Sequence, residues 1–88
     1  MADIGTVWSR IEKHAGEPFH QLRGAEFTYT IKGGSVMPNR TNRNIAKSNF
    51  EKALSLIPFQ GTTEIQHLQG PSYVYAILMD ERIRAGEW

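Results

Sequence analysis

The chain has 88 residues, no cysteine and a formal net charge of +1. This length suits one domain with one small core, and the lack of cysteine excludes disulfides, thiolate zinc sites and thiol chemistry. Neither a bilayer-spanning apolar run nor a secretory leader pattern is present in the sequence. We therefore expect a single domain over residues 1–88 in the reducing cytoplasm, with residues 1–4 and 86–88 flexible.

The first half of the chain predicts a helix followed by strands. The helix is expected to start at Thr6, whose hydroxyl suits a cap, and to stop at Gly16. A short strand over 19–22 and a turn over 23–25 should follow. Residues 26–32 alternate apolar and polar side chains, the period of a strand with one buried face. The side chains expected on that buried face are Phe27, Tyr29 and Ile31.

A diglycine marks the next turn. Gly33 and Gly34 suit the positive φ angles of a two-residue hairpin, which predicts an antiparallel partner strand over 35–37. Pro38 is expected to end the pairing because it lacks an amide donor. Residues 39–44 contain no apolar side chain and should form a surface loop. Ile45 then starts a brief strand or anchors the returning loop.

Two more helices are expected in the second half. Ser48 and Glu51 have the spacing of a capping box, which predicts a helix that stops before Pro58. Residues 64–68 fit either a short edge strand or a packed loop. The last helix should cover 71–84, since proline is well suited to the first helical position.

These elements together predict an α+β fold. Its antiparallel sheet should have about three strands, and an N-terminal helix and two C-terminal helices should pack mainly on one face. Tyr29 shares its phase with core residues of its strand, so we interpret it as a core residue and not as a stacking platform for bases.

The charge is unevenly distributed along the chain. Residues 32–52 carry five basic side chains against one acid, a formal charge of +4, whereas the segments on either side are net negative. Lys, Arg and Asn side chains contact phosphates in nucleic-acid complexes. The basic segment 39–48 is therefore the candidate nucleic-acid or anion site. Its proposed contacts are Arg40, Arg43 and Lys47, with Lys32, Asn42 and Asn44 in support.

Other interpretations stay open. A polar loop with two arginines is most often only solvated, and the chain's pI of about 8.1 is lower than that of a dedicated binder. The chain could instead be a protein-interaction module or small homodimer that uses a sheet edge or the last helix around Tyr73 and Trp88. The sequence shows no catalytic constellation, metal-ligand spacing or cofactor motif, so we expect a non-enzymatic protein.

Overall fold

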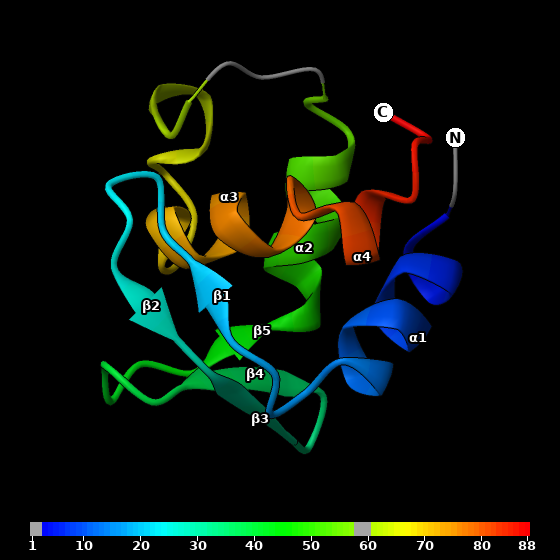
Figure 1. The fold of residues 1–88 in the computed structure, drawn as a ribbon. Coiled ribbons are helices and arrows are strands. Elements are labelled where there is room, and N and C mark those ends of the chain that lie inside the picture. The colour runs from blue at the N-terminus through cyan, green and yellow to red at the C-terminus, as the bar shows by residue number, and fades with distance from the viewer. Residues whose placement is uncertain (1–2, 58–60) are drawn as a thin grey trace.

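The structure is a computed structural model that describes residues 3–57 and 61–88, and Figure 1 shows the later helices above the larger sheet and the N-terminal helix to its right. The α+β class that the sequence predicts is confirmed. The elements in chain order are α1 (Ile4–Lys13), β1 (Phe19–His20), β2 (Glu26–Phe27), β3 (Tyr29–Lys32), β4 (Ser35–Pro38), β5 (Ile45–Ala46), α2 (Lys47–Leu54), the 3-10 helix η1 (Thr63–Ile65), α3 (Pro71–Leu78) and α4 (Glu81–Arg84).

The described strands form two antiparallel sheets, one of β1 and β2 and one in the order β3, β4, β5. The expected strand over 26–32 is divided at Thr28. Before this residue the chain pairs with β1, and after it the chain pairs with β4. The Thr28 amide donates to Asn39 Oδ1 at 2.9 Å, and the Thr28 carbonyl accepts from the Asn39 amide at 2.9 Å. The third strand of the larger sheet is β5, which begins at Ile45, and not the early strand over 19–22.

The diglycine turn forms as the sequence predicts. Gly33 and Gly34 have φ angles of 56° and 79°, and they join β3 to β4 in antiparallel register. The prediction that Pro38 stops the pairing is wrong, since this residue lies opposite Tyr29 inside β4 and Asn39 continues the ladder. The next residue, Asn39, donates its amide to the Thr28 carbonyl, and because hydrogen-bonded positions alternate in an antiparallel pair, the missing amide of Pro38 faces away from β3.

Two helix starts differ from the predictions. Asp3 caps α1, because its Oδ1 accepts from the amide of Thr6 at 2.9 Å, so Thr6 lies inside the helix. The capping box of Ser48 is not formed: α2 begins one residue earlier and has no side-chain cap. Strand β5 leads directly into α2, and the Lys47 amide donates to the Gly34 carbonyl at 3.0 Å, which sets this earlier start.

The C-terminal third also departs from expectation. The helix starts at Pro71 as predicted but ends at Leu78, and Asp80 caps the separate helix α4. Residues 64–68 form no strand: part of this segment is η1, and it packs as a loop with Ile65 and Leu68 buried. The helix stop expected at Pro58 lies outside the described residues.

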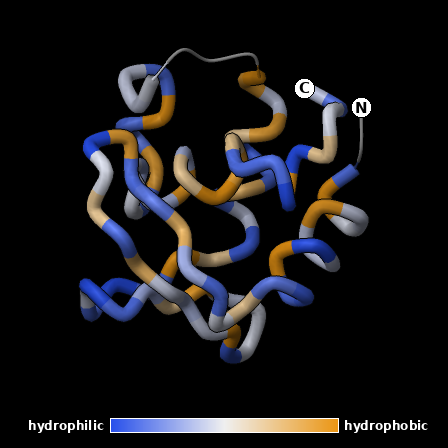
Figure 2. Tube along the Cα trace, viewed as in Figure 1, coloured by the Kyte–Doolittle hydropathy of each residue, from blue (hydrophilic) through white to orange (hydrophobic). Residues whose placement is uncertain are grey.

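The core lies between the helices and the inner faces of both sheets. Tyr29 is only 1% exposed, and its hydroxyl donates to the Ile11 carbonyl at 2.6 Å, so the core interpretation of this residue is confirmed. Trp8 of α1 meets Phe50 of α2 edge to face, with ring centres 5.8 Å apart. Figure 2 shows that the loop 39–44, at the lower left, is a hydrophilic projection from this body.

Candidate nucleic-acid interface

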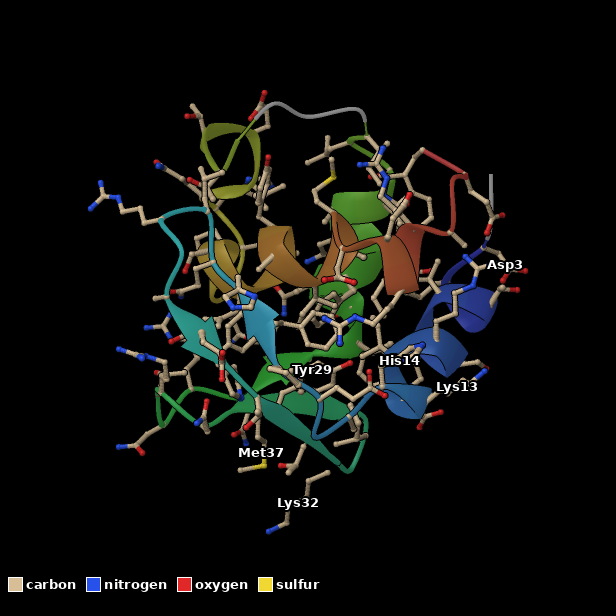
Figure 3. All side chains as sticks on the ribbon, in the orientation of Figure 1. Asp3, Lys13, His14, Tyr29, Lys32 and Met37 are labelled. Atoms are coloured by element: carbon tan, nitrogen blue, oxygen red, sulfur yellow. The ribbon has the colours of Figure 1, made fainter. Side chains whose placement is uncertain are left out.

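No helix of residues 3–57 and 61–88 covers one face of the larger sheet (Figure 1). The alternation along β3 and β4 buries Tyr29 and Val36 on the helix side and turns the intervening side chains outward. Figure 3 shows Lys32 and Met37 pointing away from the helices on this side. We call this surface the outer face. Its residues are Thr30, Lys32, Ser35, Met37 and Ala46, in which Thr30 pairs with Met37 and Ser35 pairs with both Lys32 and Ala46.

The larger sheet belongs to a stretch of sequence that contains no acid. Residues 27–50 include β3, β4, β5, the loop between β4 and β5 and the start of α2, and they carry four basic side chains. All nine acids of the chain lie in the remaining residues, together with six basic side chains. The formal charge is therefore +4 over residues 27–50 and −3 over the rest. The fold places the whole +4 charge on one sheet and its connections.

Four of the six predicted site residues lie together. Residues 39–44 form a loop, whereas residues 45–48 of the basic segment belong to β5 and α2. Arg40, Asn42, Arg43 and Asn44 are all exposed in this loop. The Arg40 guanidinium donates to the Glu26 carbonyl at 3.3 Å, and the Arg43 amide donates to Thr41 Oγ1 at 3.2 Å. These bonds shape the loop and leave its charged groups at the surface.

The other two predicted residues lie at the opposite end of the hairpin. Lys32 is the last residue of β3, beside the diglycine turn. Lys47 lies next to that turn because its amide donates a hydrogen bond to the Gly34 carbonyl, and its ammonium lies 5.9 Å from the centre of the Trp8 ring. A four-residue strand spans about 13 Å. The structure therefore divides the predicted site into a loop end, with Arg40 and Arg43, and a turn end.

These cations have no acidic partners in the described part of the chain. Lys32, Arg40, Arg43 and Lys47 form no ion pair there, in contrast to Arg10 and Arg82, which each contact a carboxylate. The Glu26 carboxylate instead lies 3.5 Å from His20 Nε2. Unpaired, solvated cations are the groups that replace the counterions of a nucleic-acid backbone.

Sequence reasoning missed a second polar cluster, which lies where α4 meets the connection between α1 and β1. Arg82 donates to both carboxylate oxygens of Asp80, to Glu17 Oε1 and to the Pro18 carbonyl. The hydrogen bond from His14 and the contact with Arg82 lower the pKa of Glu17, and the Arg82 hydrogen bond lowers that of Asp80. Because Arg82 uses most of its donors on its own chain, we assign this cluster to stability.

The described surface also has an open hollow whose lining contains no carboxylate and no histidine. The hollow has a volume of about 400 Å³ and is lined by neutral side chains and one arginine, and the Gln21 amide donates to Ser72 Oγ across it at 3.2 Å. Within residues 3–57 and 61–88 no three histidine or acidic side chains gather as a metal site. The complete lining is Gln21, Leu22, Arg23, Thr62 and Ser72.

Comparison with known proteins does not identify a family for this chain. Neither the protein-family models nor the curated proteins nor the solved structures include a match to this chain. The helices of the described residues are all too short or too polar to cross a membrane.

Proposed function

We propose that this is a small non-enzymatic domain that acts in the cytoplasm as an accessory nucleic-acid-binding protein. The observation that carries the proposal is the acid-free stretch 27–50, whose four cations are free of ion pairs with the described residues. Arg40 and Arg43 would contact phosphates, because the planar guanidinium fork matches phosphate oxygens. Lys47, Lys32, Asn42 and Asn44 would add weaker contacts.

The test is fluorescence anisotropy with labelled DNA and RNA at about 50 mM and about 200 mM salt. If four phosphates are contacted, affinity should fall on the order of 100-fold between these conditions, because counterions are released on binding. The double variant Arg40→Ala and Arg43→Ala should weaken binding to all sequences alike and reduce the salt dependence by about two phosphate contacts.

A matched control removes two charges elsewhere. Lys13 on α1, labelled in Figure 3, and Arg23 in the turn between β1 and β2 are also exposed. The variant Lys13→Ala with Arg23→Ala has the same net charge as the loop variant but keeps Arg40 and Arg43. It should therefore bind nearly as well as the unchanged chain. Equal losses in the two variants would show a general charge effect, and the absence of binding at low salt would refute the proposal.

Protein interaction remains the alternative function. Leu22 favours it, because this apolar side chain is 63% exposed at the rim of the open hollow. The two aromatic residues that the sequence suggests for such a surface make contacts within the protein instead. The ring centres of Tyr73 and Phe27 lie 4.9 Å apart, and Trp88 Nε1 donates to the Leu78 carbonyl at 2.9 Å. A dimer whose mass in size-exclusion chromatography falls on Leu22→Ser would support this alternative.

A further inference from the structure

We propose that the ligand is double-stranded DNA and that the outer face lies across its major groove. This inference depends on the proposed function, since it names the class of nucleic acid that the same surface would bind. It starts from the division of the cations into two groups. Lys32 at the turn end and Arg40 with Arg43 at the loop end are separated by the length of the β3–β4 hairpin, which is about 13 Å.

The separation of the two groups matches a dimension of B-form DNA. The major groove is about 12 Å wide and the minor groove about 6 Å wide. The residues that carry the two groups lie at or beyond opposite ends of a strand pair about 13 Å long, so their long side chains can each reach one phosphate wall of the major groove, whereas the minor groove is too narrow for this arrangement. The outer face between them has no acid to repel either wall.

Two other classes of nucleic acid fit less well. Single strands are held by aromatic side chains on which the bases stack, but the outer face has no aromatic residue, because Tyr29 is buried in the core. Duplex RNA has a deep, narrow major groove and a wide, shallow minor groove, so neither groove combines the width and depth of the DNA major groove. The geometry therefore favours duplex DNA.

The outer face also predicts the mode of contact. The central pair, Thr30 and Met37, is flanked by the small residues Ser35 and Ala46. The major groove is about 8.5 Å deep, three of these four side chains are short, and the longer Met37 has no hydrogen-bond donor, so a sheet whose ends are supported by both phosphate walls offers little to the base edges. Binding should therefore depend on the form of the duplex and be the same for different base sequences.

The experiment compares three labelled ligands of one sequence: duplex DNA, duplex RNA and single-stranded DNA. Thr30→Glu places an acid at the centre of the outer face, and Ser9→Glu places the same charge at an exposed position of α1. We expect tightest binding to duplex DNA, and we expect Thr30→Glu to weaken that binding about tenfold more than Ser9→Glu because the acid would lie between two rows of phosphates. Lys32→Ala should lower the salt dependence by about one contact.

The possible outcomes separate the two proposals. If none of the three ligands binds, the proposed function itself fails. If single-stranded DNA or duplex RNA binds as tightly as duplex DNA, only the present inference fails. Equal effects of Thr30→Glu and Ser9→Glu, in proteins whose urea unfolding shows that both are folded, would also overturn it, because the outer face would then not touch the ligand.

Discussion

The guanidinium carbon of Arg82 lies 3.8 Å from the centre of the Phe19 ring. The ring is fully buried, and the cation above it is held by hydrogen bonds to Asp80, to Glu17 and to the Pro18 carbonyl. One side chain thus joins α4 to the segment that enters β1. These hydrogen bonds also raise the pKa of Arg82, with Asp80 as the main cause, so it is charged at every pH at which the protein folds.

We expect Arg82→Ala to lower the free energy of unfolding by about 1 to 3 kcal/mol, the range for hydrogen bonds to charged groups together with a partly exposed cation–π contact. Arg82→Lys keeps the charge but not the planar fork, so most of this loss should remain. Urea unfolding measures both changes. Full stability in the lysine variant would show that charge alone is needed.

Acid should destabilise the fold through the partners of Arg82. Asp80 and Glu17 have ordinary pKa values of 3.8 and 4.5, and both values are lowered in the folded state. Their contributions are complete above these ordinary values and are lost as the pH falls through the lower folded values. We therefore expect constant stability down to about pH 5 and a steady decline below it.

Asp80→Asn isolates one part of this decline, because asparagine also caps helices but has no charge. The stability difference between the variant and the unchanged chain should be largest near neutral pH and shrink in acid. Urea unfolding across the pH range measures it. A difference that is independent of pH would contradict the role assigned to the Asp80 carboxylate.

Gly70→Ala should destabilise the protein by about 1 to 3 kcal/mol. Gly70 has a φ of +51°, and a Cβ atom added there would lie 2.6 Å from Cδ1 of the fully buried Ile45. Both the backbone conformation and the contact oppose alanine. Gly5→Ala is the matched control, because Gly5 lies in α1 and its added Cβ would meet only Asp3 Oδ1, at 3.4 Å.

The control variant Gly5→Ala should change the stability in the opposite direction. Alanine is favoured over glycine in helices, so we expect Gly5→Ala to raise the free energy of unfolding by about 0.5 kcal/mol. Thermal unfolding of the two variants gives the comparison. If Gly70→Ala is as stable as Gly5→Ala, the close approach of residue 70 to Ile45 is not present in solution.

Tyr29→Phe removes one buried donor. The Ile11 carbonyl would lose the hydroxyl that now lies 2.6 Å away, and leaving a buried acceptor unsatisfied costs about 1 to 3 kcal/mol. Burial also raises the pKa of Tyr29, so its phenolate absorbance should appear in alkaline titration only when the fold opens. This late phase should be missing in the variant, and unchanged stability would show that the hydrogen bond contributes little.

Local patterns predicted those parts of the fold that depend on neighbouring residues. The alternation around Tyr29, the turn at Gly33 and Gly34 and the helix start at Pro71 follow from side-chain period and backbone preference, and the structure has all three. The partner change at Thr28 did not follow, because it depends on the side chain of Asn39 reaching the Thr28 amide. The pattern of residues within a strand does not predict which other strand it will pair with.

The candidate site was predictable in charge but not in arrangement. Counting basic residues identified the stretch that includes Arg40 and Lys47, but only the strand register shows that these two lie at opposite ends of a hairpin. The Arg82 cluster was missed for a related reason, since Glu17 and Arg82 are 65 positions apart. Contacts between such distant residues depend on the folded path of the chain.

The separation of charge between the sheet and the helices has a consequence for how the protein meets other molecules. A net charge of +1 suggests almost no attraction to an anionic partner. However, +4 is concentrated on the larger sheet and its connections while −3 is spread over the rest of the chain, and this uneven distribution should give the protein an electric dipole moment on which the field of an extended polyanion exerts a torque. The protein would turn its larger sheet toward the polyanion as it approaches, so that a larger share of collisions would begin with the basic side in contact.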